Sequence, residues 1–127
     1  MATRDLDEAR RVLGPLLGLR WGDVATDVEP GLGGPDGPLA WRCHRCRSQG
    51  GFPLELLEGD ETSTWATDGL ATLHHIGYWS DDIAGEVAAL EAEGWELEAT
   101  LRGPAGEVTA FAYLRRRGDV RIELVDA

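Results

Sequence analysis

The stretch Leu73-His74-His75-Ile76-Gly77-Tyr78-Trp79-Ser80-Asp81-Asp82-Ile83 decides how the rest of the chain is interpreted. Its apolar and aromatic residues predict a strand from Thr72 to Trp79. A helical pattern begins at Asp82 and ends at Gly94, with apolar residues at Ile83, Val87 and Leu90, so we expect a helix over 82–93. The stretch is therefore a strand followed directly by an amphipathic helix.

The same pattern occurs near the start of the chain, which indicates an internal repeat. Asp5 and Glu8 form a variant of the capping box ahead of helically spaced apolar residues, so residues 5–17 are also predicted as a helix. Strand-like segments follow both helices, and each half closes on a matching strand, Leu54–Glu58 or Ile122–Asp126. The repeat unit is strand-helix-strand-strand-strand, with module one at 1–63 and module two at 70–127 of a single domain.

Three segments between these elements are predicted as connections. Pro30–Pro38 is expected to be a loop, because it combines three prolines with four glycines. The segments Gly103–Gly106 and Arg117–Asp119 are expected to be hairpin turns. The polar segment Asp60–Trp65, at the junction of the two modules, is a candidate lid.

Composition narrows the range of partners. The chain has 127 residues and a net charge of −11, which disfavours nucleic acids and anionic membranes. Neither a membrane helix nor a signal peptide is recognisable, so we expect a cytoplasmic protein with two reduced cysteines. All 12 basic residues are arginine, a bias that suggests a GC-rich bacterial genome.

The paired histidines followed by Ile76-Gly77, the amphipathic helix and the closing strand Arg121–Asp126 resemble the vicinal oxygen chelate superfamily. Its members include glyoxalases, methylmalonyl-CoA epimerases, extradiol dioxygenases and bleomycin-resistance proteins, and the glyoxalase-like and epimerase-like branch fits best. The resemblance implies an α+β fold of two βαβββ modules, whose curled mixed sheets surround a shared cavity.

Strand alternation and the resemblance together select candidate site residues. In a strand, adjacent side chains point to opposite faces, so only one of His74 and His75 can face the cavity. The resemblance implies that His75 is a metal ligand, with Glu55 and Glu123 as the strand carboxylates. Two carboxylates and an imidazole suit a divalent ion such as Mn, Mg, Co, Ni or Fe(II). The alternative is that each glutamate simply faces solvent.

We find no residue in this sequence for a fourth metal ligand. Aligning Asp82 with Asp5 places the counterpart of His75 before Met1, so the first strand of module one is expected to be missing. Either the start codon lies upstream or the strand has been lost. We therefore expect little or no bound metal, weak activity, an open sheet edge beside the first helix, and a homodimer.

The sequence supports two functions. The first is a small-molecule isomerase, epimerase or lyase in which a metal held by Glu55, His75 and Glu123 stabilises an enolate, with Glu123 and Glu55 as catalytic carboxylates. The second is a metal-free protein that sequesters or presents an aromatic or polyketide-like ligand, which the five tryptophans could contact.

Other motifs are weaker. Cys43-His44-Arg45-Cys46 lacks the second cysteine pair of a zinc site and is interpreted as two ordinary strand cysteines. The Pro30–Pro38 glycines do not match a dinucleotide-binding fingerprint. Arg115-Arg116-Arg117 is interpreted as a solvated turn, with an acyl-CoA phosphate as the alternative partner.

Overall fold

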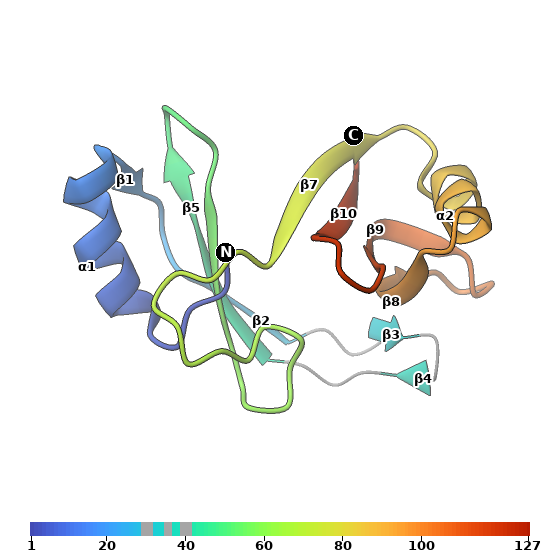
Figure 1. Ribbon diagram of the computed structural model, residues 1–127, viewed down its shortest axis with the longest axis horizontal. Coiled ribbons are helices and arrows are strands. Elements are labelled where there is room, and N and C mark those ends of the chain that lie inside the picture. Colours follow the sequence, from blue (N-terminus) through green and yellow to red (C-terminus); the bar gives the residue numbers. More distant parts are fainter. Residues whose placement is uncertain (29–31, 35–36, 39–41) are drawn as a thin grey trace. The chain divides into compact units, whose positions relative to one another are not determined.

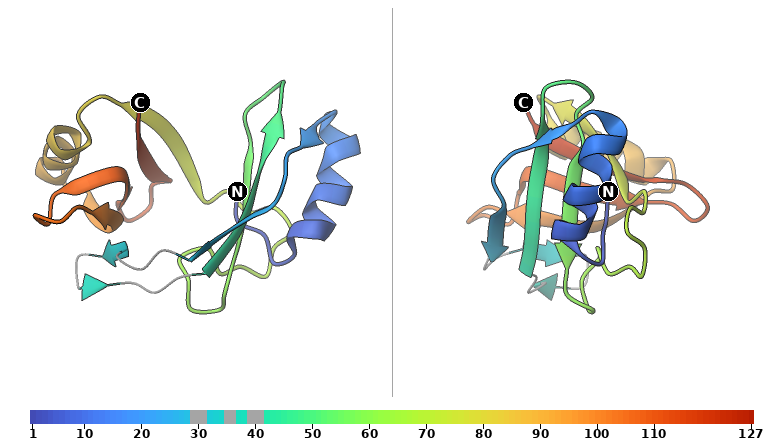
Figure 2. Two further views of the ribbon diagram at one scale, coloured as in Figure 1. Left: turned by 180° about the vertical axis from the view of Figure 1, so that it is seen from behind. Right: turned by 90° about the vertical axis from the view of Figure 1, so that its left-hand side faces the viewer.

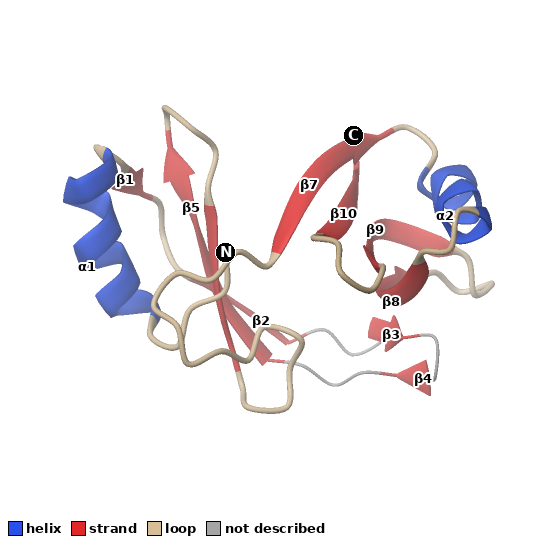
Figure 3. Cartoon of the chain, in the orientation of Figure 1, coloured by secondary structure: helices blue, strands red, loops and turns tan. Residues whose placement is uncertain are grey.

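The computed structural model describes residues 1–28, 32–34, 37–38 and 42–127, which form two compact units (Figure 1). The first unit comprises Met1–Glu29 and Trp41–His74, and the second comprises Pro30–Ala40 and His75–Ala127. Each unit contains one helix and one sheet, as the colouring by secondary structure shows (Figure 3). The fold is α+β, in agreement with the prediction.

The sheet of the first unit is built around β5 (Arg42–Gln49). One edge of β5 pairs with β6 (Glu55–Gly59), and the other pairs with β1 (Arg20–Trp21) and then β2 (Ala25–Val28), all antiparallel. Helix α1 (Leu6–Leu17) lies alongside this sheet (Figure 2). It buries Leu6, Ala9 and Leu13 in one apolar cluster with Cys46 and Leu56.

The N-terminal residues complete this sheet in a way that the sequence did not predict. Ala2 forms a parallel bridge to Leu57 of β6 and an antiparallel bridge to Thr72. The Ala2 and Thr72 backbones exchange two hydrogen bonds of 2.9 Å. The expected open edge was therefore wrong over this stretch, because Met1–Thr3 lies beside β6 and Thr72 covers its outer side.

The second unit has a sheet with the order β4-β3-β8-β9-β10-β7. Its strands are β3 (Leu32–Gly34), β4 (Gly37–Pro38), β7 (His75–Ser80), β8 (Glu96–Arg102), β9 (Val108–Arg115) and β10 (Arg121–Asp126). Only the β10–β7 pair, among the described strand pairs, is parallel. Helix α2 (Ile83–Ala92) covers one face, where Ile83 and Val87 pack against Leu97, Ala112, Leu114 and Leu124.

The prediction of a loop throughout Pro30–Pro38 was wrong. Gly33 and Gly34 of β3 pair with Pro38 and Gly37 of β4, and β3 also pairs with β8. Pro38 is tolerated because β4 is the last strand of the sheet, where a missing N–H breaks no ladder on the outer side. Residues 30–31 and 35–36 of this segment lie outside the described part of the structure.

The other predicted elements are confirmed, with shifted ends. Asp5 and Asp82 are the N-caps, and their carboxylates accept hydrogen bonds from the backbone N–H groups of Glu8 and Gly85. The strand predicted from Thr72 begins at His75. Gly106 and Gly118 occupy the two predicted hairpin turns with φ of 84° and 89°, where a side chain would be strained. No helix in the described residues is long and apolar enough to cross a bilayer.

Candidate functional site

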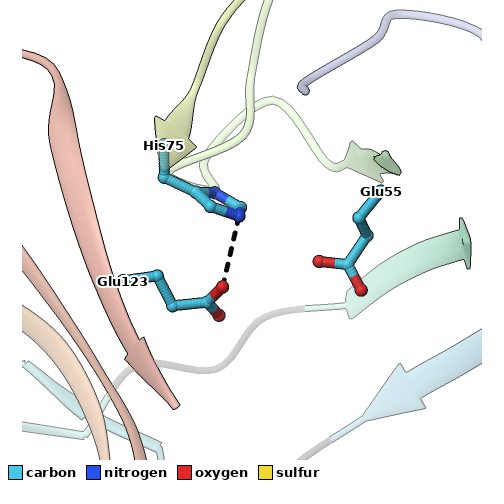
Figure 4. Close-up of side chains that lie close together, drawn as sticks. All are labelled: Glu55, His75 and Glu123. Atoms are coloured by element: carbon cyan, nitrogen blue, oxygen red, sulfur yellow. Dashed lines mark ion pairs between the residues drawn. The ribbon is translucent and has the colours of Figure 1, made fainter. Parts of the chain in front are cut away.

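The second unit brings His75 and Glu123 together on neighbouring strands. Because β7 and β10 are parallel, with Glu123 opposite Gly77, the side chains of His75 and Glu123 emerge from the same face of the sheet. The distance from His75 Nε2 to a Glu123 carboxylate oxygen is 3.2 Å, and only 7% and 16% of the two side chains are exposed (Figure 4). Two of the three predicted site residues therefore form an ion pair within this unit.

The adjacent histidine has a different role. His74 belongs to the first unit, where its Nε2 lies 2.9 Å from the carbonyl oxygen of Thr64 and its ring is 6.3 Å from that of Trp65. This residue is buried, with 7% exposed. The two histidines thus have separate partners, and His74 lies just before the first residue of β7.

Gly77 leaves space beside the Glu123 carboxylate. A Cβ atom built on Gly77 would lie 3.4 Å from Glu123 Oε2, and no other heavy atom comes within 4 Å of it. On the other side of Glu123, the buried Tyr113 of β9 lies directly opposite in register. The ring of Tyr113 is 5.2 Å from that of His75, so an aromatic wall borders the pair.

A second ion pair on this face was missed by sequence reasoning. Arg121 is the register partner of His75, and its guanidinium donates from Nε and Nη2 to the two carboxylate oxygens of Glu98. The two side chains are 19% and 17% exposed. Glu98 lies at a bulge in β8, and a bulge cannot be located from a strand pattern alone.

Glu55, the third predicted site residue, lies in the first unit beside two arginines. Its Oε1 accepts a hydrogen bond of 2.8 Å from Arg47 Nε and lies 3.5 Å from Arg45 Nη1. Only 15% of the Glu55 side chain is exposed. The sequence prediction did not include these arginines, although both lie on β5 at the spacing that places them on one face with Glu55.

Glu55 and Glu123 hold the same position in the two halves. Ala2 pairs with Leu57, two residues after Glu55, and Trp79 pairs with Val125, two residues after Glu123. In both cases the glutamate belongs to a strand that runs parallel to the segment preceding a helix. The neighbouring antiparallel strand places Arg47 opposite Glu55 but Tyr113 opposite Glu123.

Comparison with known proteins assigns the family. The model of the Glyoxalase/Bleomycin resistance protein/Dioxygenase superfamily matches residues 1–113. The chain belongs to this superfamily. Two solved structures of glyoxalase-type enzymes resemble this superfamily member. One is the trypanothione-dependent glyoxalase I of Leishmania major, with 16% identity, a TM-score of 0.34, and coverage of 99% of this chain and 81% of that chain.

The other is a lactoylglutathione lyase from Agrobacterium tumefaciens, with 19% identity and a TM-score of 0.34. It covers 100% of this chain and 89% of that chain. No match was found among curated proteins.

The remaining sequence candidates have structural roles in this superfamily member. Cys43 and Cys46 are buried and do not form a disulfide, and Cys46 packs beneath α1, as expected for ordinary strand cysteines. Arg116 pairs with Asp119 at 2.6 Å and lies over the Trp95 ring, which supports the prediction of a surface turn. Trp65, in the predicted lid, is 2% exposed, whereas Trp79 is 73% exposed.

Proposed function

We propose that the protein is a glyoxalase-like isomerase, epimerase or lyase for a small molecule with vicinal oxygens, and that Glu55, His75 and Glu123 hold a divalent cation. The observation that carries this proposal is the His75–Glu123 pair, in which an imidazole nitrogen and a carboxylate converge at 3.2 Å on one sheet face. Nitrogen and oxygen donors of this kind suit Mn²⁺, Co²⁺, Ni²⁺, Mg²⁺ or Fe²⁺.

The residues present fit such an ion. Gly77 has no side chain to occupy the position 3.4 Å from Glu123 Oε2 that a Cβ would take, and any larger residue would fill it. Both arginine contacts of Glu55 go to Oε1, so Oε2 is the oxygen with which Glu55 would bind a cation. Three protein ligands with waters give a weaker site than four, which is consistent with the expectation of low metal content.

A bound divalent cation would stabilise negative charge on the substrate oxygens, which makes a neighbouring C–H more acidic. In this scheme Glu123 would take a proton from that carbon and, in an isomerisation, return it to the adjacent carbon. In an epimerisation Glu123 would keep that proton, and a second acid, for which Glu55 is the candidate, would supply one to the opposite face, so the substrate loses and gains one proton. His75 fixes the orientation of the Glu123 carboxylate through their contact, and Tyr113 limits the access of water from the β9 side.

A metal titration of dialysed protein with Mn²⁺, together with elemental analysis, tests this proposal. His75→Ala and Glu123→Gln should each weaken Mn²⁺ binding about tenfold or more, because each removes a ligand. His74→Ala is the matched control: it should lower the melting temperature, since His74 is buried against Thr64 and Trp65, but leave Mn²⁺ affinity unchanged below that temperature. Equal Mn²⁺ affinity in the His75 and His74 variants would refute the assignment.

A metal-free binding protein for an aromatic ligand is the second candidate. Two observations favour it. First, Glu55 is already paired with two arginines, so its charge is balanced without a cation. In addition, Trp79 lies on the same sheet face as His75 and is 73% exposed, which offers a stacking surface. Quenching of tryptophan fluorescence by an aromatic ligand in EDTA-treated protein, lost in Trp79→Ala, would support this function.

We further propose a cytoplasmic homodimer, in which exposed sheet edges such as the outer side of β2 make the contact. Light scattering on purified protein tests the stoichiometry. A monomer at all accessible concentrations would contradict this part of the proposal.

A further inference from the structure

The first unit contains a groove at the place where β5 changes partner from β1 to β2. Trp21 pairs with Ser48 and Ala25 pairs with Arg45, while Gly22 N–H still donates to the Arg47 carbonyl oxygen, so residues 23–24 connect the two pairings. The groove has a volume of about 260 Å³ and is lined by this connection and by the β5 residues Arg45–Gln49. All of its lining residues belong to the first unit.

The side chain of Arg47 is held at this groove by one of its nitrogens. Nε donates to Glu55 Oε1 at 2.8 Å, which fixes the plane of the guanidinium group. Within the described part of the chain, this carboxylate is the contact that the Arg47 side chain makes, so its two terminal nitrogens are available to a ligand. The side chain is 61% exposed, so a ligand can reach it from solvent.

Other groups at the groove suit a ligand with anionic oxygens. A Cβ at Gly22 would lie 3.5 Å from Gln49 Nε2, so Gln49 places an amide donor beside Gly22 at the groove. Arg10 of α1 donates to the Gly22 carbonyl oxygen and so holds the Gly22 backbone at the edge of the groove. Asp23 also lines the groove and opposes the charge of Arg47, while Arg45 shares Glu55 with Arg47.

We propose that this groove binds the carboxylate of a small organic molecule, with the terminal nitrogens of Arg47 as the main donors and Gln49 as a second donor. The planar guanidinium matches a carboxylate in a two-bond fork, and Arg47 is already oriented by Glu55. That this molecule is the substrate of the enzyme rests on the proposed function. Arg47 would then link the recognition of a substrate carboxylate to the orientation of Glu55.

The test is a titration of EDTA-treated, ¹⁵N-arginine-labelled protein with propionate, followed by NMR through the arginine Nε–H signals. Propionate should shift the Arg47 signal saturably, whereas the neutral isostere propionamide should not. Arg47→Gln should weaken propionate binding about tenfold, the effect of losing one charge-assisted contact. Asp23→Asn should tighten it about twofold, because an opposing exposed charge is removed.

Arg42→Gln is the matched control. Arg42 is exposed on the same strand, but it lies five positions before Arg47, so it faces the other side of the sheet. The control should bind propionate as the unmodified protein does. Identical propionate affinity in the Arg47→Gln protein, or a weaker affinity in Asp23→Asn, would overturn the proposal. Binding of inorganic phosphate without binding of propionate would overturn the choice of a carboxylate.

Because this titration is done without metal, its outcome is independent of the proposed reaction. Saturable propionate binding that depends on Arg47, in a protein that binds no Mn²⁺, would support the groove and refute the metal-dependent function. Mn²⁺ binding that depends on His75, without propionate binding, would do the reverse.

Discussion

Replacing Gly77 by alanine should move stability and metal affinity in opposite directions. The φ angle of Gly77 is not in the left-handed region, so an alanine fits the backbone. In the unfolded chain alanine has less conformational freedom than glycine, and we expect Gly77→Ala to raise the free energy of unfolding by about 0.4–1 kcal/mol. In a domain of this size that is an increase of about 2–6 °C in melting temperature.

The same methyl group would lie 3.4 Å from Glu123 Oε2, in the space that we assign to a cation. We therefore expect Mn²⁺ affinity to fall about tenfold, as it does when a group that supports a ligand is disturbed. Gly77→Val extends the series, because its larger side chain should lower the affinity further while valine still suits a strand.

Urea denaturation of the metal-free protein measures the first effect, and competition between protein and a chelating dye for Mn²⁺ measures the second. A Gly77→Ala protein that is more stable and binds Mn²⁺ unchanged would show that the space beside Glu123 is not used by a cation. A less stable protein would show instead that the strand does not accept the methyl group.

Three further predictions concern stability. Leu114→Ala should lower the free energy of unfolding by about 2–5 kcal/mol, since Leu114 is fully buried beneath α2. Leu90→Asp should lower the free energy of unfolding by less, because Leu90 is only partly buried. Urea titrations of the two variants would compare these losses. Arg121→Gln should cost about 1–3 kcal/mol by removing the two bonds to Glu98, and an equally stable variant in the same titration would count against that pair as a stabilising contact. Burial raises the pKa of the Cys46 thiol above 9.0, so the native state retains this proton longer than the unfolded state; stability should fall as pH rises above about 9, and Cys46→Ala should remove that slope in pH-dependent denaturation.

Local signals in the sequence were sufficient to predict the two helices and the internal repeat. Asp5 and Asp82 are N-caps that bond to a backbone N–H only three residues later. The apolar face of a helix can be recognised from its own periodicity, without knowing which residues it packs against. The different partners of His74 and His75, in contrast, arise because the strand begins only at His75, and the sequence pattern predicted its start at Thr72.

Features that depend on distant partners were not predictable in the same way. Nothing local indicates that Thr72 pairs with Ala2, or that Pro38 is acceptable because it lies at the edge of a sheet completed by much later residues. The arginines beside Glu55 lie on another strand, and a strand pattern does not give the register that places Arg47 opposite Glu55.

The pairing of β3 with β8 has a consequence for how the chain folds during synthesis. Leu32 and Gly33 leave the ribosome long before their partners Leu101 and Thr100 have been made. The early segment must therefore remain unpaired while other edges are exposed, a situation in which aggregation-prone strands mispair. Glycine and proline have low β-propensity and make poor cross-β partners, so the composition that made this segment resemble a loop also keeps it soluble until β8 emerges.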